Sequence, residues 1–182
     1  MHRILKLLLT YIFSLFFFTS ISLSEIINNI KISGNERISD ETILMFSNVK
    51  IGDDLNNTSL NAILKNLYET NFFINVSVTL DDNIFSIEIE EAPLIQNITL
   101  TGIKSKNIRE EIRKNLKLKD KSSFNKFFLS KEVESIKFTL KQRGYYFAKV
   151  DSYIEELDNN LVNIEYKIDI GNKSKISKIS FI

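Results

Sequence analysis

The sequence predicts an α+β fold made of two consecutive units, each with the order β-α-α-β-β. The pattern Ile-x-x-Ile-x-x-x-Gly occurs as INNIKISG at 27–34 and again as IQNITLTG at 95–102. After each copy come two segments with apolar residues at helical spacing, and then two segments that alternate apolar and polar residues. An internal repeat on this scale indicates similar modules packed in series.

The first 24 residues have the pattern of a secretory signal peptide. Arg3 and Lys6 precede an apolar run at 7–18, and small residues follow it up to Ser24. The alternative is a membrane anchor, but that requires about 20 mainly apolar residues. The run is shorter, so we expect residues 1–24 to be removed by cleavage.

The remaining sequence lacks the residues of most catalytic and metal sites. The chain has no cysteine, and its single histidine, His2, lies in the expected signal peptide. The commonest general base, the commonest metal ligand and every Cys–His nucleophile pair are therefore absent. Among only five glycines there is no phosphate-binding loop. We expect no enzyme activity, no catalytic or metal-binding residues and no cofactor.

The charge balance gives no support to nucleic-acid binding. Without Arg3 and Lys6, 22 basic residues face 23 acidic ones, which gives a net charge of −1. Proteins that bind nucleic acids through phosphates need a basic excess. We therefore expect no nucleic-acid partner.

The first unit is expected at residues 25–93. A β-branched strand ends at Gly34, and Ser39 is predicted to cap the first helix. Ser59 is predicted to cap the second helix, which has apolar residues at helical spacing. That helix should end at Asn71, a residue that tolerates the left-handed conformation.

A hairpin is expected to complete the first unit. The segments VSVTL at 76–80 and FSIEIE at 85–90 alternate apolar and polar residues around the turn at 81–83. This alternation predicts one buried and one solvated face, with Glu88 and Glu90 on the solvated face.

The second unit is expected at 94–171, directly after Pro93, and has the same order of elements. Ser130 is predicted to cap its second helix, and Gly144 takes the place of Asn71. Paired aromatic residues follow in both units, and at least one of each pair is expected in the core. The residues assigned to the structural motif are Gly34, Asn71, Phe73, Pro93, Gly102, Gly144 and Tyr146.

The order of these motifs resembles the polypeptide-transport-associated (POTRA) domains of BamA-type outer-membrane protein assembly factors. The relevant segments are GNERIS at 34–39, LYETNFF at 67–73 and EAP at 91–93. The resemblance implies tandem POTRA domains, each a three-stranded mixed sheet with two helices on one face and the third strand central. It also implies that residues 172–182 begin a truncated third POTRA domain and that the sequence is a fragment.

The resemblance leaves the first and second strands of each unit at sheet edges, and we nominate the second strands as candidate client-docking edges. Edge strands present unpaired peptide groups to which another chain can add a strand. The alternative is that these edges are only solvated, or are covered by a neighbouring domain. The candidate client-binding edge residues are Val76, Ser77, Val78, Thr79 and Leu80 in the first unit, and Ala148, Lys149, Val150, Asp151, Ser152 and Tyr153 in the second.

The function implied by the resemblance is that of a periplasmic receptor in the outer-membrane protein assembly (BAM) machinery. Unfolded β-barrel precursors would be its clients, lipoproteins its partners, and a barrel beyond this sequence its link to the outer membrane. One alternative is a TamA-like or two-partner-secretion transporter. Another is an FtsQ-like inner-membrane division scaffold, whose single POTRA domain leaves the second unit unexplained.

Overall fold

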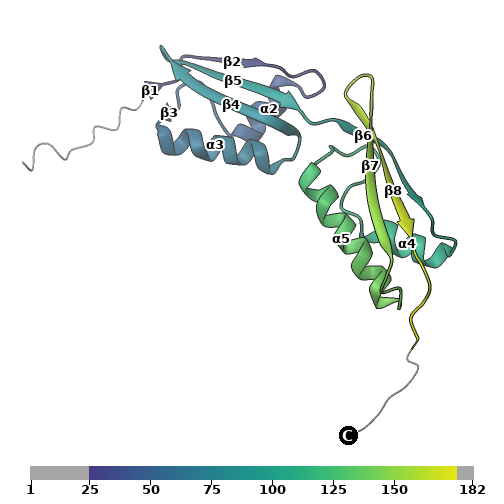
Figure 1. Cartoon of the computed structure of the whole chain (residues 1–182). Helices are drawn as coiled ribbons and strands as arrows, with labels where there is room; N and C mark the ends of the chain where they lie inside the picture. Colours follow the sequence, from purple (N-terminus) through teal and green to yellow (C-terminus); the bar gives the residue numbers. More distant parts are fainter. Residues whose placement is uncertain (1–24, 176–182) are drawn as a thin grey trace, which may run out of the picture.

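The computed structural model describes residues 25–175 (Figure 1). The expected signal peptide at 1–24 lies outside this range, as do residues 176–182 of the expected third-domain strand. Residues 172–175 form no strand. Within 25–175, no helix has the length and apolar character needed to cross a membrane.

The first unit has a three-stranded sheet in the order β2-β5-β4. Strand β5 is central, parallel to β2 and antiparallel to β4, and both helices pack on one face (Figure 1). A short antiparallel pair, β1 with β3, lies beside the start of the sheet. The elements are β1 (Glu25–Ile26), β2 (Asn29–Ser33), α2 (Asp40–Ser47), β3 (Asp54–Leu55), α3 (Asn57–Glu69), β4 (Phe73–Asp81) and β5 (Ile84–Glu91).

The second unit repeats this topology, with sheet order β6-β8-β7 and β8 in the centre. The predicted α+β class, the order β-α-α-β-β and the central third strand are thus confirmed in both units. The elements are β6 (Leu94–Thr101), α4 (Lys106–Asn115), α5 (Lys126–Gln142), β7 (Lys149–Leu157) and β8 (Leu161–Asp169).

Each unit has its own hydrophobic core between sheet and helices. Phe85 and Leu67 are fully buried in the first core, and Tyr166 and Leu140 are fully buried in the second. Apolar burial is the main driving force for folding. Because the two clusters are separate, each unit is a domain with a modest core.

Two helix starts differ from the prediction. Helix α3 begins after Asn56, whose side chain accepts a hydrogen bond from the Ser59 N–H, so Ser59 lies inside the helix. Helix α5 begins after Asn125, and Ser130 is likewise internal, with its hydroxyl donating to a carbonyl one turn earlier. Asn caps helices as well as Ser does, so the earlier cap prevailed in both cases. The predicted cap at Ser39 is confirmed.

The repeated glycines serve the same purpose in both units. Gly34 and Gly102 both have φ of 85°. A Cβ atom on Gly34 would lie 2.0 Å from the Ile89 carbonyl oxygen, and one on Gly102 would lie 1.7 Å from that of Ile168. No other residue tolerates both this conformation and this closeness. In both domains the glycine therefore allows the chain to turn at the end of the first strand while it stays close to the main chain of the central strand.

The aromatic pairs are used differently in the two units. Phe73 is 5% exposed and belongs to the first core. In the second unit Tyr145 packs against the core, whereas Tyr146 is 58% exposed. Strand β4 starts at Phe73, but β7 starts three residues after Tyr146, so the second pair lies outside the sheet.

Candidate functional site

The outer edge of β4 is defined by the hairpin that it forms with β5. Asp82 and Asn83 have positive φ and make a two-residue turn, next to which Asp81 pairs with Ile84. Residues flanking such a turn bond to each other, and bonding alternates along the strand. The peptide groups of Val76, Val78 and Leu80 therefore point outward, away from β5.

One of these outward positions is already occupied. The Tyr68 hydroxyl on α3 accepts a hydrogen bond from the Val76 N–H at 3.0 Å and lies 3.4 Å from the Val76 carbonyl oxygen. The outward peptide groups of Val78 and Leu80 have no hydrogen-bond partner within residues 25–175. The predicted edge in the first unit is thus closed at Val76 and open at Val78 and Leu80.

The outer edge of β7 follows the same geometry. Val150 faces the core as Val76 does, and β7 runs in the same sense beside its central strand. L-residues in equivalent strands with side chains on the same face direct their peptide groups to the same side. Val150, Ser152 and Ile154 therefore present outward peptide groups, for which the described chain supplies no hydrogen-bond partner.

The remaining predicted residues of this edge do not present outward peptide groups. Lys149, Asp151 and Tyr153 point their peptide groups toward β8, and Ala148 precedes the strand. Among residues 25–175 no hydroxyl closes this edge, because Lys141 stands in the place of Tyr68, with its Nζ 5.9 Å from the centre of the Tyr146 ring. Tyr153 and Ile154 are 53% and 40% exposed. Strand β7 is consequently the more open of the two predicted edges.

The chain on both sides of Pro93 is hydrogen-bonded to residues of the second domain. Asn160, in the β7–β8 turn, donates from its side chain to the Glu91 carbonyl oxygen at 3.0 Å and accepts from the Leu94 N–H at 2.9 Å. The Phe124 N–H donates to the Pro93 carbonyl oxygen at 2.7 Å. The linker is therefore held by the second domain rather than free.

Asn71 adds a contact between the domains. Its side-chain oxygen accepts a hydrogen bond of 2.9 Å from Asn125, the N-cap of α5. The main chain of Asn71 is left-handed, with φ of 59°, as is that of Gly144 with φ of 90°. Asn71 thus supplies the conformation of a glycine and also a side chain that reaches the next domain. A cleft of about 460 Å³ lies beside this contact, lined partly by Ile74 and Phe124.

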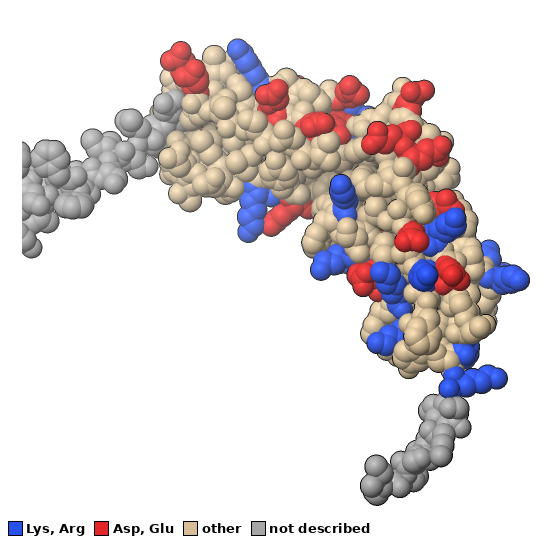
Figure 2. Space-filling view, in the orientation of Figure 1, with Lys and Arg blue, Asp and Glu red and all other residues tan. Residues whose placement is uncertain are grey.

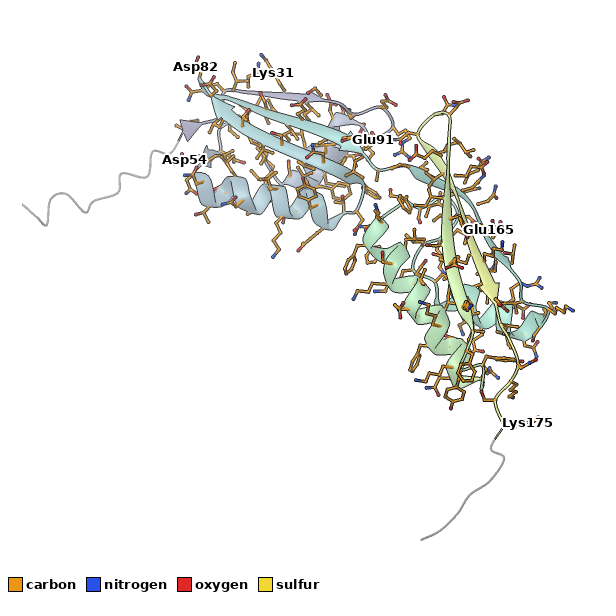
Figure 3. All side chains as sticks on the ribbon, viewed as in Figure 1. Lys31, Asp54, Asp82, Glu91, Glu165 and Lys175 are labelled. Atoms are coloured by element: carbon orange, nitrogen blue, oxygen red, sulfur yellow. The ribbon has the colours of Figure 1, made fainter. Side chains whose placement is uncertain are left out.

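A buried carboxylate not found by the sequence analysis stabilises the end of β5. Glu91 is 5% exposed and lies at the end of the first sheet (Figure 3). Its carboxylate accepts from the peptide N–H groups of Glu36, Arg37 and Ile38, and from the Arg37 guanidinium at 2.8 Å. Burial raises the pKa of Glu91, but these hydrogen bonds outweigh that effect and leave the pKa below its ordinary value. Glu88 and Glu90 are exposed, as predicted.

The second domain also contains a buried carboxylate. Glu132 on α5 is 3% exposed and accepts from the peptide N–H of Leu118 at 2.7 Å and from the Tyr166 hydroxyl. Burial raises the pKa of Tyr166, and the hydrogen bond to Glu132 raises it further. Both carboxylates fix loops to the core, and among residues 25–175 no cluster of three or more His, Cys, Asp or Glu could hold a metal ion.

Comparison with known proteins shows the nature of the repeat. The family model of the POTRA domain, described as "Surface antigen variable number repeat", matches residues 25–92 and 93–171. The outer membrane protein assembly factor BamA of Neisseria meningitidis serogroup B is 32% identical over 158 residues, which are 85% of this chain and 20% of the relative. BamA of Neorickettsia risticii is 26% identical over 167 residues, 92% of this chain and 22% of the relative. The chain thus spans about a fifth of these curated relatives.

Solved structures share the fold. The N-terminal domain of Omp85 from Thermosynechococcus elongatus has a TM-score of 0.54 at 14% identity, covering 79% of this chain and 63% of that one. POTRA1-2 of Omp85 from Anabaena has a TM-score of 0.50 at 13% identity, covering 83% of this chain and 98% of that one. Both similarities extend over the two domains.

Proposed function

Since this chain belongs to the POTRA family, and its relatives are BamA-type assembly factors, we propose that it is the periplasmic receptor region of an outer-membrane protein assembly machine. It binds unfolded β-barrel precursors by adding one of their strands to a sheet edge. Its partners are the lipoproteins of the same machine, and a barrel outside this sequence links it to the outer membrane. Residues 1–24 direct export, and 25–93 and 94–171 are the two complete domains.

The open edge of β7 is the observation that supports this function best. Its outward peptide groups at Ser152 and Ile154 have no hydrogen-bond partner in the described chain, and its surface is partly apolar. Main-chain pairing requires no particular sequence in the client, whereas apolar contacts favour the alternating strands of barrel proteins. Strand addition at β7 would therefore accept many different precursors.

A proline substitution tests the proposal directly. Ser152→Pro removes one outward N–H group. Edge strands tolerate proline at such a position, because the lost N–H forms no hydrogen bond within the sheet. We expect this change to reduce binding of a synthetic strand from a bacterial outer-membrane barrel by about tenfold or more, measured by fluorescence anisotropy.

Ser152→Ala is the matched control, because it keeps the N–H and removes only the hydroxyl. It should bind the barrel strand as the parent does, and both variants should keep the parent circular dichroism spectrum. Equal binding by the proline and alanine variants would mean that β7 does not receive the client.

A further inference from the structure

The loop between the two helices covers the start of the first strand in both domains. In the first domain, Ile27 donates its N–H to Asp53 and accepts from Gly52, both through main-chain atoms. In the second domain, Ile95 makes the same two bonds with Ser122 and Lys121. The edges of the two first strands are therefore closed in the same way at this point.

Further along the strand the two domains differ. The Ile98 N–H donates to the Asp120 carboxylate at 2.8 Å, and the Arg113 guanidinium donates to the Ile98 carbonyl oxygen at 3.1 Å. Two charged side chains thus occupy the outward peptide groups of Ile98 on β6. Ile30 is the equivalent residue on β2, and within residues 25–175 neither it nor Ile32 has a hydrogen-bond partner on the outer side.

An apolar groove lies beside this open edge. It separates β2 from α2, has a volume of about 700 Å³, and is lined by Ile30, Leu44, Met45, Val49 and Ile51 together with four polar or charged residues. Met45 and Ile51 are 67% and 66% exposed. Large apolar side chains at such exposure beside free peptide groups are typical of sites that receive an extended segment.

The charge of the first domain limits which segment this groove can receive. Residues 25–92 contain 4 basic and 12 acidic residues, a net charge of −8, whereas 93–175 contain 17 basic and 11 acidic residues, a net charge of +6. Figure 2 shows Lys and Arg gathered over the second domain. The negative field of the first domain attracts cationic segments and repels anionic ones.

We infer that the β2–α2 groove is a second docking site, which takes an extended, positively charged segment of another polypeptide. The segment pairs with the peptide groups of Ile30 and Ile32. Its alternate apolar side chains contact Met45 and Ile51, and its basic side chains face solvent in the field of the acidic domain. This site differs from the proposed client edge on β7 in its position and in its selection of a positively charged segment.

Hydrogen exchange on the full chain, with two synthetic peptides as probes, tests this inference. One peptide of eight residues alternates Val with Lys, and the other alternates Val with Glu. The lysine peptide should slow exchange of the Ile30 and Ile32 amides about tenfold or more at saturation. The glutamate peptide should not. Protection by both peptides alike, or by neither, would overturn the inference, as would protection limited to Ser152 and Ile154 on β7.

Substitution of the groove provides the second measurement. Met45→Ser should weaken binding of the lysine peptide about fivefold or more, since it removes apolar contact without disturbing the core. Phe138→Ser is the matched control, because Phe138 is 62% exposed on α5 and lies outside the groove. Equal weakening by both variants would contradict the assignment. A second copy of the chain as occupant would instead appear as concentration-dependent association lost in Met45→Ser, and would overturn the choice of a foreign segment.

Discussion

The Tyr68 hydroxyl occupies the place beside Val76 that the backbone of an added strand would need. It accepts from the Val76 N–H at 3.0 Å and lies 3.4 Å from the carbonyl oxygen of the same residue. One side chain thus satisfies both outward groups of an edge residue. Because Lys141 replaces Tyr68 in the second domain, two domains of the same topology present different edges.

Removing this hydroxyl should open the β4 edge. Tyr68→Phe is expected to cost about 1 kcal/mol of stability, because a hydrogen bond is lost while the ring remains. The exchange rate of the Val76 amide should rise by more than the change in global stability explains. Tyr153→Phe is the control, since the Tyr153 hydroxyl forms no hydrogen bond among the described residues. Unchanged exchange at Val76 in Tyr68→Phe would refute the capping role.

Gly102 and Gly52 both have positive φ but differ in their surroundings, which allows a matched comparison. Gly102→Ala should lower the free energy of unfolding by more than about 3 kcal/mol, because its Cβ would meet the Ile168 carbonyl oxygen at 1.7 Å. At Gly52, with φ of 94°, no atom lies within 4 Å of the added Cβ. Gly52→Ala should therefore cost only the conformational strain, about 1–2 kcal/mol. If the two variants unfold at the same denaturant concentration, close packing around Gly102 contributes nothing to the difference.

Phe73 and Phe72 are adjacent but contribute differently to stability. Phe73→Ala should cost about 3–5 kcal/mol, because the side chain is buried among the core residues of the first domain. Phe72 is 36% exposed and contacts Phe46, so Phe72→Ala should cost clearly less. Urea unfolding of the two variants checks this order, and a Phe73→Ala protein with the parent midpoint would disprove its place in the core.

The Glu91 carboxylate should make stability depend on pH. Because its folded pKa lies below its ordinary value, ionised Glu91 stabilises the fold above the unfolded-state pKa. That contribution is lost as the pH falls through the folded-state pKa. Glu91→Gln should therefore be less stable than the parent by about 2 kcal/mol at neutral pH.

The pH profile separates the charge of Glu91 from its shape. The difference in unfolding free energy between the parent and Glu91→Gln should stay constant near neutral pH and shrink in the acid range. Glu90→Gln is the control, because Glu90 is exposed one residue earlier and should show no such difference. A stability gap for Glu91→Gln that persists unchanged at acid pH would exclude the charge as its cause.

The order of helices and strands could be predicted from the apolar pattern, whereas the central position of the third strand followed from the resemblance to POTRA domains. Alternation at 76–80 and 85–90 placed the hairpin, and the repeated Gly34 and Gly102 aligned the two units. The helix starts were missed because Ser and Asn both cap well, and local sequence does not decide between neighbouring candidates.

The details of the site depend on contacts between distant residues, which periodicity does not contain. Tyr68 closes an edge eight residues away, and Glu91 binds a loop 53 to 55 residues earlier. The hydrogen bonds that Arg113 and Asp120 form with the main chain of Ile98 cannot be predicted from a strand pattern. One signal was present in the sequence: Glu91 continues the core-facing alternation of β5, which predicts burial.

Asn160, in the turn of the β7–β8 hairpin, forms hydrogen bonds with Glu91 and Leu94, which lie on either side of Pro93. The same hairpin carries the open edge of β7, on the side of that strand that faces away from β8. A force applied to β7 would therefore reach Glu91, the last residue of β5, through the side chain of Asn160.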